Sequence, residues 1–457
     1  MRSPAKSPAR ARCEAERMAD LAFLLASRLT TVFGGEVRID GLTRLTGGAS
    51  RETWSFQAGA RRLVLRRDPP GMDRPDGMAR EAAAIAAAAR MAVPVPHLVD
   101  AGVLETPYLI TEYVAGETIA RRLLREDRYA IARTTMAGEL GRTLARIHAI
   151  PPSAVPGLES YEPLARLRAD YDALGEPLPT IEIALRWLAR NRPDPVPETL
   201  VHGDFRTGNL IIDPDGLRAV LDWELVHRGD PREDLGWLCV KCWRFGSPLP
   251  AGGFGTVDAL LDGYAELAGW RPEPRDVLWW QIYGTARWAV LCRQMAEAHL
   301  SGATESVELA AIGRRVCEQE HDLLLALGLP AEPIEDVALA PSSDLQGRPA
   351  ATDLVAAVAH FLRDELMPAT DGRLKFLARV AANVLDGVGR ELVLGPELQR
   401  RHDMRLAAFG QHDQAGLAAA IRAGEVDADD PALLAAVRAA VTDRLAVANP
   451  RYLLDPD

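Results

Sequence analysis

The fold is decided by the stretch Leu200-Val201-His202-Gly203-Asp204-Phe205-Arg206-Thr207-Gly208-Asn209-Leu210-Ile211-Ile212, followed by Ala219-Val220-Leu221-Asp222-Trp223-Glu224. Apolar residues typical of buried strands flank both polar segments. This pattern places Asp204 and Asn209 on a loop and Asp222 at the end of a following strand. The two segments therefore combine an acidic loop with an acidic strand end.

The spacing of these polar residues matches the requirements of phosphoryl transfer. In that reaction one carboxylate orients or deprotonates the attacking hydroxyl, and oxygen ligands hold Mg²⁺ against the phosphates. Protein kinases supply these groups as a His-x-Asp motif, an Asn five positions later and a second Asp on the next hairpin. This chain presents, in that order and spacing, His202, Asp204, Asn209 and Asp222. The alternative is a turn whose carboxylates only cap backbone amides, and the spacing favours the catalytic interpretation.

The wider motif resembles one kinase family. The segments HGDFRTGN, LDWE and Gly229-Asp230-Pro231-Arg232-Glu233-Asp234-Leu235 are similar to those of the aminoglycoside phosphotransferase-type kinases. More narrowly, they resemble the kinase-like domains of acyl-CoA dehydrogenase family 10 and 11 proteins. The resemblance covers about residues 36–328. It implies an α+β, bilobal protein-kinase-like fold, with ATP between a small β-rich lobe and a larger helical lobe.

The resemblance also implies roles for individual residues. Asp204 would be the catalytic Asp, and Asn209 and Asp222 would be ligands of Mg²⁺. Three further residues would support the site by bracing the loop or anchoring backbone, namely His202, Asp230 and Asp234. ATP and Mg²⁺ are the cofactors that this assignment implies.

A phosphate-binding loop is predicted near the start of the small lobe. Thr46-Gly47-Gly48-Ala49-Ser50 lies between two predicted strands, where the backbone amides of Gly47, Gly48 and Ser50 would cover phosphates. A plain hairpin turn is the alternative. Glu81 lies early in a helix predicted from Met78 to about Met91, and it matches the helix glutamate that pairs with the phosphate-binding lysine of protein kinases.

The adenine contact is expected where the chain passes from one lobe to the other. The strand predicted over Pro107–Tyr113 corresponds in position to the linker between the lobes of a kinase. By position alone, the backbone groups of Glu112 and Val114 would meet adenine.

The sequence departs from the kinase pattern at the phosphate-binding lysine. No lysine occurs between Lys6 and Lys241, so the small lobe has none to offer. The segment Leu63-Val64-Leu65-Arg66 places Arg66 at the expected position. Its planar guanidinium can pair with Glu81 and with phosphate oxygens, although its reach and geometry differ from those of an ammonium. Two interpretations stay open: Arg66 takes the lysine's role, or the site binds nucleotide without efficient transfer.

Composition limits the kind of protein. A chain of 457 residues, 48% hydrophobic and 26% charged, excludes wholesale disorder. The net charge of −11 disfavours nucleic acid as a partner, and no apolar run approaches the ~18 residues of a membrane span. The pair Cys239-x-x-Cys242 stands alone and is interpreted as buried rather than metal-binding. The N-terminal MRSPAKSPARAR is interpreted as a tail, with a transit peptide as the alternative, and we expect a cytoplasmic protein.

The chain divides into five predicted segments. They are an N-terminal tail and leading helix (1–35), the small lobe (36–115), the helical lobe with the catalytic loop (116–329), a Pro-containing linker (330–349) and a separate all-α domain (350–457). The last resembles a helical domain of unknown function that accompanies such kinases. It is interpreted as a packing or dimerising bundle, and a dimerising bundle would make the protein a homodimer. The alternatives are a lid and a partner-docking module.

The predicted function is Mg·ATP-dependent O-phosphotransfer to the hydroxyl group of a small molecule. Several arginines and aromatic residues of the helical lobe favour an anionic or part-apolar alcohol over a polycation, among them Arg287, Arg293, Trp279, Trp280 and Tyr283. By resemblance, a hydroxyacyl thioester of coenzyme A is such an alcohol. The alternative is a nucleotide-binding, pseudokinase-like module that signals through its C-terminal helices.

Overall fold

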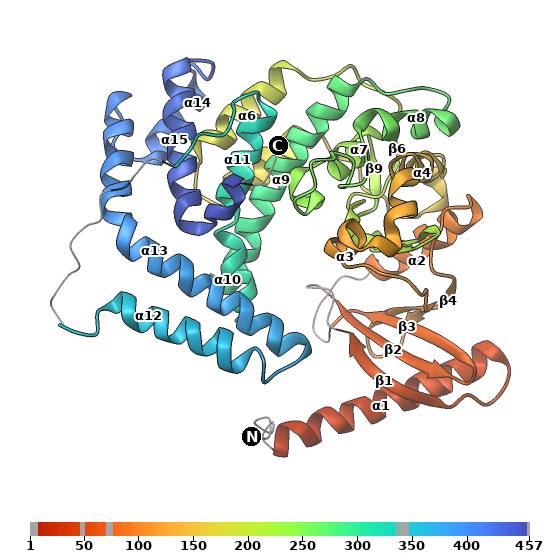
Figure 1. The fold of residues 1–457 in the computed structure, drawn as a ribbon. Helices are drawn as coiled ribbons and strands as arrows, with labels where there is room; N and C mark the ends of the chain where they lie inside the picture. The colour runs from red at the N-terminus through yellow and green to blue at the C-terminus, as the bar shows by residue number, and fades with distance from the viewer. Residues whose placement is uncertain (1–7, 46–50, 70–75, 335–336, 338–346, 455–457) are drawn as a thin grey trace. The chain divides into compact units, whose positions relative to one another are not determined.

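The structure, a computed structural model, describes residues 8–45, 51–69, 76–334, 337 and 347–454 (Figure 1). Gly47, Gly48 and Ser50 of the predicted phosphate loop lie outside the described residues, as does most of the predicted linker. The chain forms two compact units. Unit 1 comprises residues 1–160, 195–239 and 243–274, and unit 2 comprises 161–194, 240–242 and 275–457.

Unit 1 begins with helix α1 (Pro8–Phe33) packed on an antiparallel sheet (Figure 1). Leu21, Leu25 and Leu29 recur every four residues, so they share one face of the helix, and they are buried against Phe56 and Leu65 of the sheet. The five strands run in the order β1-β2-β3-β5-β4. Their bounds are β1 (Ile39–Leu45), β2 (Glu52–Ala58), β3 (Arg61–Arg67), β4 (Leu98–Val103) and β5 (Pro107–Glu112).

Helix α2 (Gly77–Arg90) packs on strands β4 and β5 and provides the predicted helix of the small lobe. Its alanines are small enough for close packing, and Ala84 and Ala88 are fully buried. Glu81 is a fully buried charged residue of the same helix. A buried carboxylate requires compensating partners, which the site supplies.

Two short antiparallel strand pairs hold the predicted catalytic segment. Strand β7 (Leu210–Asp213) pairs with β8 (Gly216–Val220), and Leu210 lies opposite Val220. This register places Asn209 beside Leu221, whose amide donates to the Asn209 carbonyl at 2.8 Å. The second pair, β6 (Thr199–Val201) with β9 (His227–Gly229), brings the start of the catalytic loop beside the segment that follows Glu224.

Helices α4 (Ala130–His148) and α8 (Val257–Ala268) make the most intimate helix packing of unit 1. A Cβ atom at Gly263 would lie 2.2 Å from the Gly138 carbonyl oxygen, and one at Gly141 would lie 2.1 Å from that of Leu260. Glycine is therefore required at both crossing points. The remaining helices of unit 1 are α3 (Ala120–Arg125) and α7 (Arg232–Leu238).

Unit 2 is built from helices. They are α5 (Pro163–Asp172), α6 (Pro179–Arg190), α9 (Pro274–Leu300), α10 (Val307–Gly313), α11 (Val316–Ala326), α12 (Ala351–His360), α13 (Gly372–Ala408), α14 (Gln414–Ala423) and α15 (Pro431–Ala448). Trp279, Trp280 and Tyr283 are almost completely buried in a core shared with Leu188 and Leu323. These aromatic residues, which favoured an anionic or part-apolar alcohol in the sequence, pack on one another in this core.

A second core of unit 2 joins the C-terminal helices to two earlier helices. Leu433, Val441 and Leu445 of α15 are fully buried together with Leu324 of α11, and Ile183 of α6 belongs to the same cluster. Polar contacts join the same helices. Arg422 of α14 pairs with Glu182 of α6, and Arg438 of α15 pairs with His321 of α11. Residues 350–454 are mostly helical, and the core formed by α13, α14 and α15 is continuous with that of α6 and α11. In the described part of the chain, no helix has the length and hydropathy of a membrane span.

Candidate active site

Near the start of the predicted catalytic loop lies a glycine that no other residue could replace without strain. Gly203 has φ +80°, and a Cβ atom there would lie 2.5 Å from the Leu225 carbonyl oxygen. Asp234 fixes the same turn, because its carboxylate accepts from the amides of His202 at 2.8 Å and Gly203 at 2.9 Å. Asp234 also accepts from His148 Nε2 at 3.0 Å. Burial raises the pKa of Asp234, but the His148 contact and the amides outweigh it and hold the pKa below its usual value.

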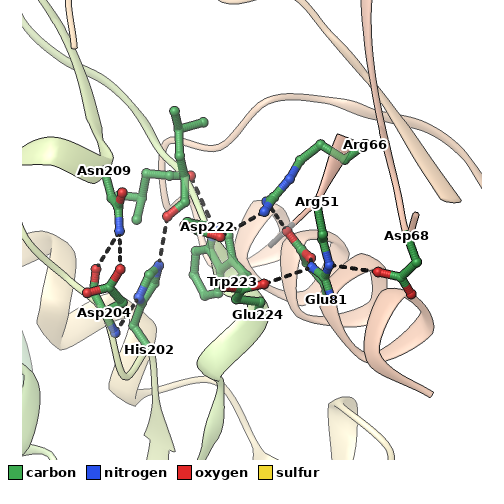
Figure 2. Close-up of polar contacts among 12 residues, drawn as sticks. Arg51, Arg66, Asp68, Glu81, His202, Asp204, Asn209, Asp222, Trp223 and Glu224 are labelled. Carbon is green, nitrogen blue, oxygen red and sulfur yellow. Dashed lines mark hydrogen bonds and ion pairs between the residues drawn. The ribbon is translucent and has the colours of Figure 1, made fainter. Parts of the chain in front are cut away.

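His202 ties the loop to the neighbouring hairpin. Its Nδ1 accepts from the Asp204 amide at 3.2 Å, and its Nε2 donates to the Leu221 carbonyl at 3.1 Å (Figure 2). Only a neutral imidazole can accept at one nitrogen and donate at the other. Burial, which lowers the pKa of His202, favours the same neutral form. The contacts are those of a brace that holds the loop.

Asp204 is held by three donors. Its carboxylate accepts from Asn209 Nδ2 at 2.6 Å, from Trp237 Nε1 at 2.9 Å and from Arg206 Nε at 3.0 Å. Asn209 also donates from Nδ2 to the Asp204 carbonyl at 2.9 Å (Figure 2). Since the amide nitrogen of Asn209 is committed to Asp204, its oxygen is the atom left to bind a ligand.

Asp222 lies two residues after the end of β8 and has an unusual backbone conformation. Its φ is 66° and its ψ is 63°, a left-handed geometry that is uncommon for residues other than glycine and is often found at functional sites. Its Oδ1 accepts from Arg66 Nη2 at 2.8 Å. Burial raises the pKa of Asp222, but the charge and hydrogen bond of Arg66 outweigh it, with a smaller contribution from the charge of Arg206, so the pKa is lowered.

Two arginines share the buried Glu81. Arg66 pairs with one carboxylate oxygen and Arg51 with the other (Figure 2). Arg51 also reaches Asp68 at 3.1 Å and Glu224 at 3.6 Å. The structure therefore brings together Arg66, Glu81 and Asp222, which the sequence predicted for one site. Arg51, Asp68 and Glu224 complete the same cluster.

The charge and donor set of this cluster suit a divalent cation. Two guanidinium groups face four carboxylates, so the cluster has an excess of negative charge. The Asn209 oxygen and the Asp222 carboxylate are ligands of the type that Mg²⁺ prefers, and Mg²⁺ is commonly held by one or two such groups plus substrate phosphates. Across the described residues there is no group of three or more His, Cys, Asp or Glu that could hold a metal alone. The residues thus fit Mg²⁺ completed by phosphate oxygens.

The other predicted residues have clear positions. The Glu112 amide donates to the His97 carbonyl at 2.9 Å, so an adenine contact there would have to use the Glu112 carbonyl. Val114 follows the end of β5. Asp230 accepts from the Arg232 amide and side chain at the start of α7. Cys239 and Cys242 are buried, as expected.

Comparison with known proteins agrees with this geometry. Residues 41–276, just over half of the chain, match the phosphotransferase enzyme family. The chain belongs to this family. Residues 368–452 match a domain of unknown function, DUF6285, within the predicted C-terminal helical domain.

Relatives of this phosphotransferase occur in mammals as parts of longer proteins. Acyl-CoA dehydrogenase family member 10 of Mus musculus is 31% identical over 216 residues, which are 44% of this chain and 20% of that protein. Family member 11 of Rattus norvegicus is 31% identical over 227 residues, which are 46% of this chain and 29% of that protein. The chain thus spans less than a third of the length of these relatives.

The solved structures confirm the predicted fold class. A Ralstonia eutropha protein assigned to the aminoglycoside phosphotransferases has a TM-score of 0.53 and 22% identity, and the match covers 67% of this phosphotransferase and 97% of that chain. The fold is therefore kinase-like and bilobal, with a five-stranded antiparallel sheet in the small lobe, a helical larger lobe and additional C-terminal helices.

Several residues that contact the site were missed from the sequence, among them Arg51, Arg206 and Trp237. Arg51 follows the predicted phosphate loop directly, and its position beside that loop was the available signal. Arg206 stands within the decisive stretch, two residues after Asp204. Trp237 carries no local signal, because only the fold brings it to Asp204.

Proposed function

We propose that this phosphotransferase transfers the γ-phosphoryl group of ATP to a hydroxyl group of a small molecule in a Mg²⁺-dependent reaction. The observation that carries the proposal is the meeting of Asp204, Asn209 and Asp222, with Arg66 paired to Asp222 at 2.8 Å. These residues come from two lobes of a kinase-like fold. Their types and order are those that phosphoryl transfer requires.

Each residue has a proposed role. Asp204 orients the acceptor hydroxyl and takes its proton late in the transfer. Asn209 and Asp222 hold Mg²⁺, which neutralises charge on the phosphates when it is bound. Arg66, positioned by Glu81, contacts the phosphates in place of the kinase lysine. The backbone of Gly47, Gly48 and Ser50 covers the phosphates, and that of Glu112 and Val114 contacts adenine.

The proposed acceptor is an anionic or part-apolar alcohol, with a hydroxyacyl thioester of coenzyme A as the leading example. Support comes from the mammalian relatives, whose names describe acyl-CoA dehydrogenases and which are longer than this chain. Trp279, Trp280 and Tyr283 do not support this choice of acceptor, because their rings are buried in the core of unit 2.

A second candidate function is nucleotide binding without efficient transfer. It is favoured by one contact, since Arg66 pairs with Asp222 and so competes with a metal for that carboxylate. In that case the site would bind nucleotide as a signal, and the protein would pass this signal on through the C-terminal helices of unit 2. Product formation distinguishes the two functions.

The test is a screen for phosphoryl transfer. Wild-type protein is incubated with Mg²⁺, γ-labelled ATP and a panel of hydroxyacyl-CoA thioesters that vary in chain length and hydroxyl position. Labelled thioester should form with the wild type and with the control variant Asp215→Asn. Asp215 is an exposed residue in the turn between β7 and β8. Asp204→Asn should form none. Equal product from Asp204→Asn would refute the mechanism, and binding of ATP without product from any acceptor would favour the second candidate.

A further inference from the structure

We propose that Arg206 is a further catalytic residue, whose guanidinium binds the phosphoryl group during its transfer from ATP to the acceptor. The inference rests on the proposed function and adds one named group to it. It starts from the contacts that fix this side chain.

The Arg206 guanidinium is fixed on two sides. Its Nε donates to both carboxylate oxygens of Asp204, at 3.0 and 3.2 Å. Its plane is backed by the ring of Trp243, with the guanidinium carbon 4.7 Å from the ring centroid. Trp243 in turn packs on Trp237, which donates to Asp204. The side chain is therefore held rigidly beside the catalytic carboxylate.

The outer edge of the same guanidinium remains available. Among the residues that the structure describes, neither Nη atom of Arg206 has a hydrogen-bond partner, and the side chain is 26% exposed. An arginine that served only to neutralise Asp204 would gain more from a two-pronged pair through both edges of the fork. Here only Nε faces the carboxylate, so the two Nη groups can donate to an anion.

A glycine makes room for this arrangement. A Cβ atom at Gly208 would lie 2.4 Å from Arg206 Nη1, a distance that real atoms do not adopt. The absence of a side chain at position 208 therefore lets the guanidinium fold over the catalytic loop. This requirement gives a second way to displace Arg206 without removing its charge.

Arg206 lies beside the path that the transferring phosphoryl group would follow. The phosphoryl group would move between the metal ligand Asp222 and the base Asp204, and Arg206 Nε donates to the Asp204 carboxylate at 3.0 Å. The described cations of the neighbouring cluster are already paired with carboxylates: Arg66 with Glu81 and Asp222, and Arg51 with Asp68 and Glu81. Arg206 is thus the cation beside the base with unused donors.

The two Nη groups of Arg206 would stabilise the charge that develops on the phosphoryl group during the transfer. A bond forms between the acceptor oxygen and the γ-phosphorus, the bond from that phosphorus to the β–γ bridging oxygen breaks, and ADP leaves with the bond's electron pair. The acceptor proton passes to Asp204. Charge spreads over the equatorial phosphoryl oxygens in between, and fixed donors aimed at such charge lower the barrier.

The test compares the affinities for a ground-state ligand and a transition-state mimic. Calorimetry measures the affinity of the protein for Mg·ADP alone and for Mg·ADP together with aluminium fluoride, which mimics the transferring phosphoryl group. Arg206→Gln should weaken the aluminium fluoride complex by about 100-fold, the loss typical of one preorganised donor. Affinity for Mg·ADP alone should change by less than about threefold, because no interaction with ADP itself is lost. Arg206→Lys should recover part of the loss, and Gly208→Ala should reproduce it in part.

Arg218→Gln is the control, and two results for Arg206→Gln would contradict the proposal. Arg218→Gln removes an exposed arginine from strand β8 and should leave both affinities unchanged. Equal aluminium fluoride affinity in Arg206→Gln and the wild type would overturn the inference. Parallel loss of both affinities would also overturn it, because Arg206 would then only support the fold of the site. Failure of the wild type to bind Mg·ADP at all would refute the proposed function itself, and the inference with it.

Discussion

At the scale of single residues, buried charges with several partners hold the site. Asp234 accepts two loop amides and a histidine, and Glu81 is shared by two arginines. Such charges are stable only when every partner is present, and removing one leaves a buried charge uncompensated. The site is consequently intolerant of small backbone changes.

The first prediction concerns the glycine of the catalytic loop. Gly203→Ala should destabilise the protein more than Gly157→Ala, although both glycines have positive φ. The left-handed conformation costs an alanine about 1–2 kcal/mol at either position. At Gly157 nothing lies within 4 Å of the new Cβ, whereas at Gly203 it meets the Leu225 carbonyl. Urea unfolding of both variants measures the difference, and equal destabilisation would contradict the account.

The second prediction concerns the neutral His202. Its pKa is lowered in the folded state by burial, so below about pH 6.5 the unfolded chain binds a proton that the folded chain does not. Stability due to this residue is present above that pH and is lost as the pH falls. The unfolding free energy of the wild type relative to His202→Gln should therefore shrink from about pH 7 to about pH 5.5, by at most about 1.4 kcal/mol per pH unit. An increase over that range would show that His202 is protonated in the fold.

At the scale of elements, local signals were sufficient for some parts and not for others. The catalytic segment and helix α2 were predictable because strand patterns, turn residues and apolar periodicity are local. Strand β4 was missed, since its residues are half-buried or exposed and lack a clear alternation. The arrangement of Asp204 with Trp237, and of Arg66 with Asp222, depends on contacts between distant segments that no local pattern encodes.

The third prediction tests the crossing of α4 and α8. Gly263→Ala should destabilise the protein by about 1–3 kcal/mol, the usual cost of overpacking, because its Cβ would lie 2.2 Å from a backbone oxygen of α4. Gly138→Ala, on the facing helix, meets its nearest atoms at 3.5 Å or more and should gain up to about 1 kcal/mol of helix propensity. Thermal and urea unfolding measure both, and a neutral Gly263→Ala would refute the close packing.

At the scale of the whole molecule, the C-terminal helices belong to a core that begins much earlier in the chain. Leu433 and Val441 are buried in one cluster with Ile183 and Leu324. The sequence alone suggested a separate bundle, because the Ala- and Leu-rich pattern shows that helices form but not which helices they meet. The helical domain of unknown function and part of the larger kinase lobe therefore share one hydrophobic core in unit 2.

The fourth prediction follows from this shared core. Leu433→Ala should cost about 2–5 kcal/mol, as expected for a fully buried leucine. Hydrogen exchange should accelerate in α6 and α11 as well as in α15, since all three contribute to the cluster. Leu354→Ala on the exposed face of α12 serves as the control. Faster exchange confined to residues 431–448 would show that the C-terminal helices fold independently.

The central claim is that Asp204, Asn209 and Asp222 form a metal-dependent ATP site in which binding and transfer depend on different residues. The most direct measurement is a calorimetric titration of ATP, with and without Mg²⁺, into the wild type, Asp222→Asn and Asp204→Asn. We predict that the wild type binds ATP only with Mg²⁺, that Asp204→Asn retains this binding, and that Asp222→Asn loses at least about tenfold in affinity because a metal ligand is removed. Mg²⁺-independent binding, or unchanged affinity in Asp222→Asn, would contradict the assignment of the site.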